Sequence, residues 1–175
     1  MDKFLVRNAK PEDAYWIAFV NAHTWYTTYK WLISEKVLKT RIDSINERTE
    51  RTRESIENGK IYLVVEDIEI NKIVWMLSYG HSRNENYPNS GEIVAIYVLQ
   101  EYQKLGIGKK LFFAWIKELI KLWYNDMIIN VLEWNNAINF YKKYGGIVIG
   151  ERYDQFGKEM LKEFVLFFED IKSIK

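Results

Sequence analysis

The chain has 175 residues, 48% hydrophobic and 28% charged, a composition typical of a folded domain, which excludes a disordered or fibrous chain. Its 25 Lys and Arg residues nearly balance its 24 Asp and Glu residues, so a protein that coats nucleic acid or an anionic membrane is disfavoured. With no cysteine and two histidines, the chain can form neither a disulfide framework nor a thiolate nucleophile, and we expect no metal site.

Neither a linker nor a membrane segment is evident in the sequence. The longest apolar run, Ala14 to Val20, is far too short to span a bilayer, and the opening MDKFLVRNAK lacks the apolar core of a signal peptide. No repeat, low-complexity tract or Pro/Gly/Ser-rich stretch is present. We therefore expect one cytoplasmic domain over residues 1–175, with no membrane or nucleic-acid partner.

The first third of the chain predicts one strand followed by helices. Pro11, followed by two acidic residues, is typical of a helix start, because proline pre-sets φ and the acids lie at the positive end of the helix dipole. The run 43–58 is so charged that we expect a solvent-exposed helix ended by Gly59. The predicted elements are a strand at FLVRNA, a helix from Pro11 to about Tyr29, a helix beginning at Ser34, and the charged helix.

The remainder of the chain alternates between strand and helix patterns. KIYLVVED and KIVWMLSYGHSR are β-rich runs joined by a short polar turn, which indicates a hairpin. The later elements are a loop at NENYPNS, a strand at GEIVAIYVL, a helix over 106–123, a strand at MIINVL, a short helix over 136–144, and a closing hairpin of IVIGERYD and KEFVLFFED. This order predicts an α+β, or mixed α/β, arrangement of layers.

The stretch IVAIYVLQEYQKLGIGKKL, from Ile93 to Leu111, carries the strongest functional signal. A buried strand is followed by a short polar loop and then by two glycines that open an amphipathic helix. Gln103, Gly106 and Gly108 fit the pattern [Arg/Gln]-x-x-Gly-x-[Gly/Ala]. Glycine allows a ligand close to the backbone, and the first N–H groups of a helix have no internal partner. The loop is therefore predicted to bind a phosphate group.

Two nucleotide-binding motifs are absent from this stretch. A nucleotide-hydrolase loop requires Gly-x-x-x-x-Gly-Lys-[Ser/Thr], and a dinucleotide fingerprint requires a glycine where Leu111 stands. A regulator that binds ATP or NAD is therefore the least favoured of three hypotheses.

Over most of its length the chain resembles the GNAT superfamily of acyl-coenzyme-A-dependent N-acetyltransferases. The resemblance is strongest at EIVAIYVLQEYQKLGIGKKL and NVLEWNNAINFYKKYG. It implies a central, twisted, mostly antiparallel sheet of about seven strands flanked by helices. It also implies acetyl-coenzyme A as co-substrate, no metal, and a possible homodimer.

The resemblance assigns coenzyme-binding roles to three segments. The pyrophosphate is held mostly by main-chain N–H groups of Gln103, Lys104, Leu105, Gly106, Ile107, Gly108 and Lys109. The pantetheine arm lies along the strand end at Ile96, Tyr97 and Val98. Asn135 and Asn139 meet the pantetheine, although capping of the following helix explains Asn135 or Asn136 equally well.

Two residues are expected to carry the chemistry. The resemblance makes Tyr141 the acid for the departing thiolate; transfer from a phenol to a thiolate is uphill by roughly 2 kcal/mol, so a hydrogen bond to the developing thiolate is the alternative. Glu92 begins the coenzyme strand and is expected either to take the amine's proton, directly or through water, or to be a solvated acid at a strand end.

The acceptor is predicted to be a primary amine of a small molecule or peptide, and an aromatic wall formed by Trp25, Tyr29 and Trp31 is expected to bind it. The alternative is that these rings belong to the helix core.

Four residues differ from those usual in the family. Trp31, Trp75 and Trp134 stand where family members usually have smaller residues, and we expect them near the cleft. Gly146 replaces a usual Phe, so a packing contact is expected to be missing. A non-catalytic acyl-coenzyme-A sensor is the second functional hypothesis.

Overall fold

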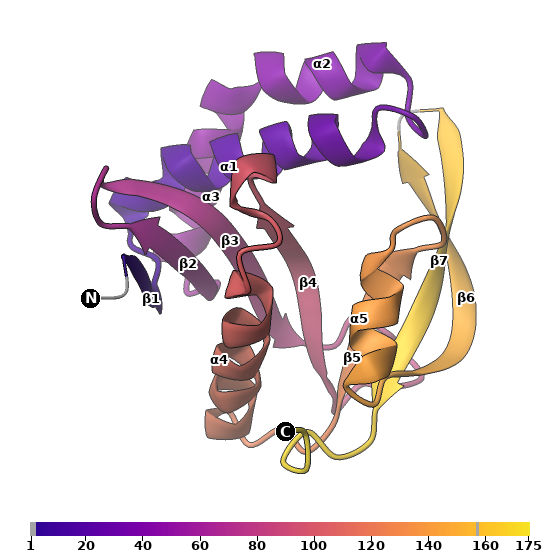
Figure 1. The fold of residues 1–175 in the computed structure, drawn as a ribbon. Helices are drawn as coiled ribbons and strands as arrows, with labels where there is room; N and C mark the ends of the chain where they lie inside the picture. The colour runs from indigo at the N-terminus through magenta and orange to yellow at the C-terminus, as the bar shows by residue number, and fades with distance from the viewer. Residues whose placement is uncertain (1–2, 157) are drawn as a thin grey trace. The chain divides into compact units, whose positions relative to one another are not determined.

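The computed structural model of the chain describes residues 3–156 and 158–175 (Figure 1). Nearly every predicted element is present, together with one short 3-10 helix, η2, that the sequence patterns missed. The elements are β1 (Phe4–Asn8), η1 (Pro11–Asp13), α1 (Ala14–Tyr29), α2 (Glu35–Asp43), α3 (Ile45–Glu57), β2 (Tyr62–Asp67), β3 (Lys72–His81), β4 (Gly91–Val98), η2 (Gln100–Tyr102), α4 (Ile107–Lys121), β5 (Met127–Leu132), α5 (Ala137–Lys143), β6 (Ile147–Phe156) and β7 (Glu159–Phe168).

The strands follow the order β1-β2-β3-β4-β5-β7-β6 in one sheet. The β4–β5 pair is parallel, while β1–β2, β2–β3, β5–β7 and β6–β7 are antiparallel. The prediction of a mixed α/β fold with a mostly antiparallel sheet of about seven strands is therefore confirmed. Within the described residues, each helix is too short or too polar to span a lipid bilayer.

Contacts divide the chain into two compact units, each assembled from two separate stretches. The first unit comprises the chain up to Ser78 together with Ala95–Ala114, and the second comprises Tyr79–Val94 together with Trp115–Lys175. Because the boundaries fall within β3, β4 and α4, these three elements contribute residues to both units.

The core of the first unit lies on both faces of the β2–β3 ribbon. On one face, α1 packs against the ribbon in a cluster of Ile17, Val20, Tyr62, Val64, Ile73 and Met76. On the other face, the start of α4 contributes to a cluster of Val65, Val74, Trp75 and Leu111. Helix α1 also packs against α2 and α3 (Figure 1). Apolar residues on both faces of these strands explain their nearly continuous hydrophobic sequence.

The charged helix α3 is largely exposed, as its sequence predicts. Arg51 pairs with Glu47 and Arg53 with Glu50, each about one turn apart on its surface. The helix ends before Gly59, whose φ of 86° is the left-handed conformation that glycine adopts readily.

In the second unit, the long β6–β7 hairpin lies beside β5 (Figure 1). Gly146, just before β6, was expected to leave a packing contact missing, and this prediction is wrong. A Cβ at Gly146 would lie 2.8 Å from Cζ of Phe168 and 3.0 Å from the carbonyl oxygen of Tyr141. The buried Phe168 ring therefore fills the space beside residue 146, which requires glycine there.

We expect Gly146→Ala to reduce the free energy of unfolding by roughly 1–3 kcal/mol, because the added methyl group overlaps a packed ring and a backbone oxygen. Urea denaturation of both proteins measures the change. Gly150→Ala is the matched control, since nothing lies within 4 Å of a Cβ at position 150. Equal stabilities of the two variants would contradict the packing explanation.

Candidate functional site

The structure confirms the predicted strand–loop–helix arrangement in the first unit. After β4 and η2, the chain forms an exposed loop and then enters α4 at Ile107, whose side chain lies outside the described part of the structure. Within the loop, Lys104 has a φ of 62° and Gly106 a φ of 73°. A left-handed lysine is an uncommon, strained conformation of a kind that occurs at ligand-binding loops.

Geometry gives this loop the means to bind an anion. The first-turn N–H groups of α4 have no carbonyl partner in the helix, and the positive end of the helix dipole lies at the same place. Lys104 and Lys109 are exposed around the helix start and add positive charge. Such a combination is suited to a phosphate or pyrophosphate group.

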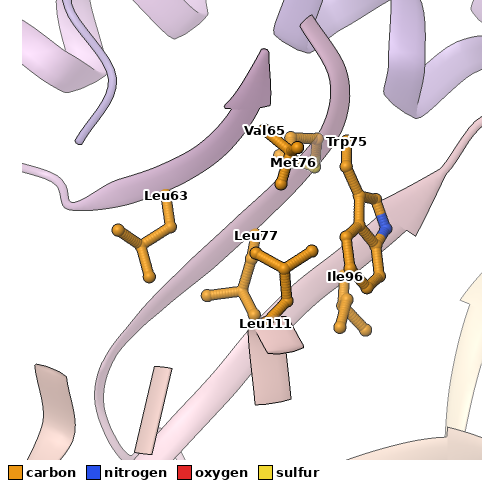
Figure 2. A pocket seen from close by; sticks show the side chains of 7 residues that line it. All are labelled: Leu63, Val65, Trp75, Met76, Leu77, Ile96 and Leu111. Atoms are coloured by element: carbon orange, nitrogen blue, oxygen red, sulfur yellow. The ribbon is translucent and has the colours of Figure 1, made fainter. Parts of the chain in front are cut away.

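Trp75 lies beneath the loop, in the core of the first unit. Its Cη2 atom is 3.7 Å from the position that a Cβ would take at Gly108, and its side chain is 6% exposed. Figure 2 shows the indole beside Ile96 and Leu111 at a small pocket, whose other lining residues are Leu63, Val65, Met76 and Leu77. The lining is apolar except for the indole N–H of Trp75, which is buried and has no hydrogen-bond partner among the described residues. The contact with Gly108 means that Trp75 packs against the start of α4.

The predicted pantetheine segment, Ile96 to Val98, is half-buried at the end of β4. The carbonyl oxygen of Val98 accepts a hydrogen bond from Oγ1 of Thr24 at 3.0 Å and from Nε2 of Gln103 at 3.3 Å. These bonds attach α1 and the loop to the same strand end. The Val98 carbonyl oxygen is therefore already engaged by two side chains.

Two of the three predicted wall residues lie together. The rings of Trp25 and Tyr29 are buried with their centroids 4.9 Å apart, and Trp25 also approaches Tyr97 of β4 at 6.4 Å. Trp31, in contrast, is 83% exposed, with Nζ of Lys30 5.1 Å from its ring. We call the three rings of Trp25, Tyr29 and Tyr97 the aromatic wall, to which Trp31 does not belong. The burial of Trp25 and Tyr29 agrees with the alternative that these rings belong to the helix core.

Tyr141 lies on α5 in the second unit. Its side chain is buried, and this burial raises the pKa of the phenol well above its ordinary value. The Tyr141 hydroxyl group is consequently un-ionised at neutral pH and able to donate a hydrogen bond. Trp134, shortly before α5, is 72% exposed.

Glu92 is completely buried, so the expectation of a solvated acid at a strand end is wrong. Its carboxylate accepts hydrogen bonds from the backbone N–H, Nε and Nη2 of Arg83, with the backbone bond at 2.7 Å, and from Nδ2 of Asn130 at 3.3 Å. Sequence reasoning missed both partners, because Arg83 lies in a loop and Asn130 in an ordinary apolar strand. A buried carboxylate in the second unit is thus held by a half-exposed guanidinium.

The predicted coenzyme residues of the second unit have simpler surroundings. Oδ1 of Asn135 accepts the backbone N–H of Ala137 at 2.9 Å, which caps the start of α5. Asn139 is exposed on the same helix. Within the described residues, no three His, Asp or Glu side chains are grouped so as to hold a metal ion.

The sequence of the chain matches a known protein family and a curated relative. Residues 57–145 match the family described as "Acetyltransferase (GNAT) domain". A curated relative, the uncharacterized N-acetyltransferase YuaI of Bacillus subtilis (strain 168), is 31% identical over 170 residues, which cover 97% of this chain and 95% of that protein.

Solved structures with the same fold include two acetyltransferases. PaiA N-acetyltransferase from Thermoplasma acidophilum, in complex with coenzyme A, has a TM-score of 0.72 at 20% identity, with 95% of this chain and 98% of that chain covered. YncA, a putative acetyltransferase from Salmonella typhimurium with its cofactor acetyl-CoA, has a TM-score of 0.70 at 20% identity, covering 95% and 93%. With a family match over half its length and a relative 31% identical along nearly all of it, the chain belongs to the GNAT family of acetyltransferases.

Proposed function

We propose that this GNAT acetyltransferase moves the acetyl group of acetyl-coenzyme A to a primary amine of a small molecule or peptide, by direct attack. The observation that carries the proposal is the exposed loop before α4, with its left-handed Lys104 and Gly106. Two structures of the same fold contain coenzyme A or acetyl-CoA, as their descriptions state.

The loop residues fit the pyrophosphate of the coenzyme. Main-chain N–H groups from Lys104 to Lys109 act as donors, since the first turn of α4 leaves its amides without helical partners. The N–H of Gln103 is already bonded to the carbonyl oxygen of Gln100 at 3.2 Å, so Gln103 contributes through the shape of the loop. The backbone of Ile96 and Tyr97 binds the pantetheine arm, and Asn139 contributes a side-chain amide. Asn135 already caps α5 and contributes through the position of that helix.

Direct transfer requires an unprotonated amine and a protonated leaving group. The amine nitrogen attacks the thioester carbonyl carbon, the carbon–sulfur bond breaks, and the sulfur leaves as a thiolate. The nitrogen loses one proton and the thiolate gains one, so the products are an amide and free coenzyme A. Binding that aligns amine and thioester supplies much of the rate acceleration.

Tyr141 acts on the leaving sulfur in this proposal. Because burial raises the pKa of its phenol, full proton transfer to a thiolate is more unfavourable than for an exposed tyrosine. Tyr141 therefore stabilises the developing thiolate as a hydrogen-bond donor, with proton transfer late or shared.

Glu92 stays the predicted acceptor of the amine's proton. Its oxygens already accept hydrogen bonds from Arg83, so a proton reaches the carboxylate most readily through a bridging water. The competing role for Glu92 is to fix Arg83 and the loop that follows β3, and the two roles make different predictions for variants.

Gly108→Trp is expected to weaken coenzyme binding strongly, because a large side chain at the first turn of α4 blocks the approach of the pyrophosphate. Calorimetric titration with coenzyme A measures affinity, and we expect a loss on the order of a hundredfold, which corresponds to about 2.7 kcal/mol. Gly108→Ala is the control, since its Cβ would make only an ordinary 3.7 Å contact with Trp75. Unchanged affinity in a folded Gly108→Trp protein would refute the loop assignment.

Tyr141→Phe is expected to lower kcat on the order of a hundredfold while KM for acetyl-coenzyme A changes little, because only the hydrogen bond to the leaving sulfur is lost. Release of free thiol in the presence of a panel of amines measures the rate. An unchanged kcat would remove Tyr141 from the mechanism. Coenzyme binding by the wild type without thiol release for any amine would favour the non-catalytic sensor instead.

Arg83→Met is expected to destabilise the protein by roughly 2–3 kcal/mol, since it leaves the buried Glu92 carboxylate without its guanidinium partner. Adding Glu92→Gln to this variant should restore part of the loss, because no buried charge then remains. Urea denaturation of the two single variants and the double variant tests this, and additive losses would contradict it. If Glu92 accepts the proton of the amine, Glu92→Gln lowers kcat under conditions in which this variant is fully folded.

A further inference from the structure

Two arginines of the first unit lie half-buried on neighbouring helices, and neither has an acidic partner among the residues that the structure describes. Arg41, on α2, donates through Nη1 to Oδ1 of Asn21 at 3.0 Å. Arg48, on α3, donates through Nε to Oγ of Ser44 at 3.2 Å. Both acceptors are neutral. Oγ of Ser44, which accepts the bond from Arg48, also donates to the carbonyl oxygen of Arg41 at 3.3 Å, so the two residues adjoin. Burial, together with the positive charge of Arg48, lowers the pKa of Arg41 to about 10.

In the part of the chain that the structure describes, Arg41 and Arg48 differ from all other arginines in having no ion pair with Asp or Glu. The chain has seven arginines, and the other five each form an ion pair with Asp or Glu: Arg7, Arg51, Arg53, Arg83 and Arg152. The negative charge of Glu47 acts on Arg48, but its carboxylate pairs with Arg51. A desolvated charge without a counterion is unfavourable, so this arrangement calls for an anion from outside the described chain.

The cations adjoin the aromatic wall. The Cζ atom of Arg41 lies 3.6 Å from the centre of the Trp25 ring, within stacking distance. Trp25 in turn contacts Tyr29 on its own helix and Tyr97 of β4. The hydrogen bond from Thr24 to Val98 attaches α1 to the strand segment that we assign to the pantetheine arm. Arg41 and the coenzyme segment are thus joined through one continuous set of contacts inside the first unit, and Ser44 links Arg48 to Arg41.

We propose that Arg41 and Arg48 bind a carboxylate or phosphate group carried by the amine acceptor, an inference that rests on the proposed acetyltransferase function. A guanidinium stacked on an aromatic ring keeps its N–H edges directed outward in the ring plane, where carboxylate and phosphate oxygens fit in pairs. The substrate class is therefore a small amine that also bears an anionic group. Polyamines and basic peptides are disfavoured, because a second cation would face two arginines.

The experiment compares matched acceptors that differ in the anionic group. β-Alanine is paired with β-alaninamide, and O-phosphoethanolamine with ethanolamine; kcat/KM is measured for each with saturating acetyl-coenzyme A. The ratio within a pair is then compared between wild type and variants, which cancels the different basicities of the amines. We expect Arg41→Gln and Arg48→Gln each to lower the ratio by roughly tenfold or more, mainly through KM of the anionic member.

Controls separate recognition from folding. Arg53→Gln on α3 removes an arginine that is already paired with Glu50, and its ratio should match wild type. Arg41→Lys keeps the charge but loses the planar fork, so its ratio should fall between wild type and Arg41→Gln. Thermal unfolding verifies that each variant is folded, and if Arg41→Gln is not, Arg41→Lys and Arg48→Gln carry the test.

Three results would overturn the inference and leave the acetyltransferase function intact. The first is equal kcat/KM for anionic and neutral acceptors in the wild type. The second is a ratio that Arg41→Gln and Arg48→Gln do not change. The third is a loss of affinity for coenzyme A in Arg41→Gln and Arg48→Gln, measured by calorimetry, that is as large as the loss in the ratio. Such a loss would assign the arginines to a phosphate of the coenzyme. Failure of the function itself is distinct, since it appears as coenzyme binding with no thiol release for any amine.

Discussion

An α-helix cannot satisfy the N–H groups of its own first turn, and the segment from β4 to α4 depends on this constraint. The chain leaves β4, turns through the exposed loop around Gly106 and starts α4 with those donors at its end. Below, Trp75 packs near Gly108 and keeps the start of the helix in place. The first unit thus presents rigid backbone donors on a packed core, which is the arrangement an anionic ligand requires.

Charged side chains that are buried or half-buried have two kinds of hydrogen-bond partners in this protein. In the second unit, Glu92 is fully buried but its carboxylate is held by Arg83 and Asn130. In the first unit, Arg41 and Arg48 are half-buried, and within the described residues their hydrogen bonds go to the neutral acceptors Asn21 and Ser44. Partners within the chain compensate the buried charge of Glu92, whereas in our proposal an anionic group of the acceptor compensates the charges of Arg41 and Arg48.

Two residues that differ from the usual family residues lie in different units, and in both cases the space left by neighbouring side chains explains the size of the residue. Gly146 is small because Phe168 occupies the neighbouring space, and Trp75 is large because it fills the core beneath the loop. Cores tolerate such exchanges when the total volume is conserved. Neither residue lines a polar acceptor site, so the exchange concerns packing within each unit.

The sequence by itself determined the order of the elements and the loop from Gln103 to Lys109, because strands, helix starts and glycine turns depend on residues close together in the chain. Only the tertiary structure decided that Arg83 holds Glu92, that Phe168 covers Gly146, and that Arg41 stacks on Trp25. Those contacts join segments that meet only when helices and strands pack. The surroundings of a charge are therefore set by the whole core, and no local pattern encodes them.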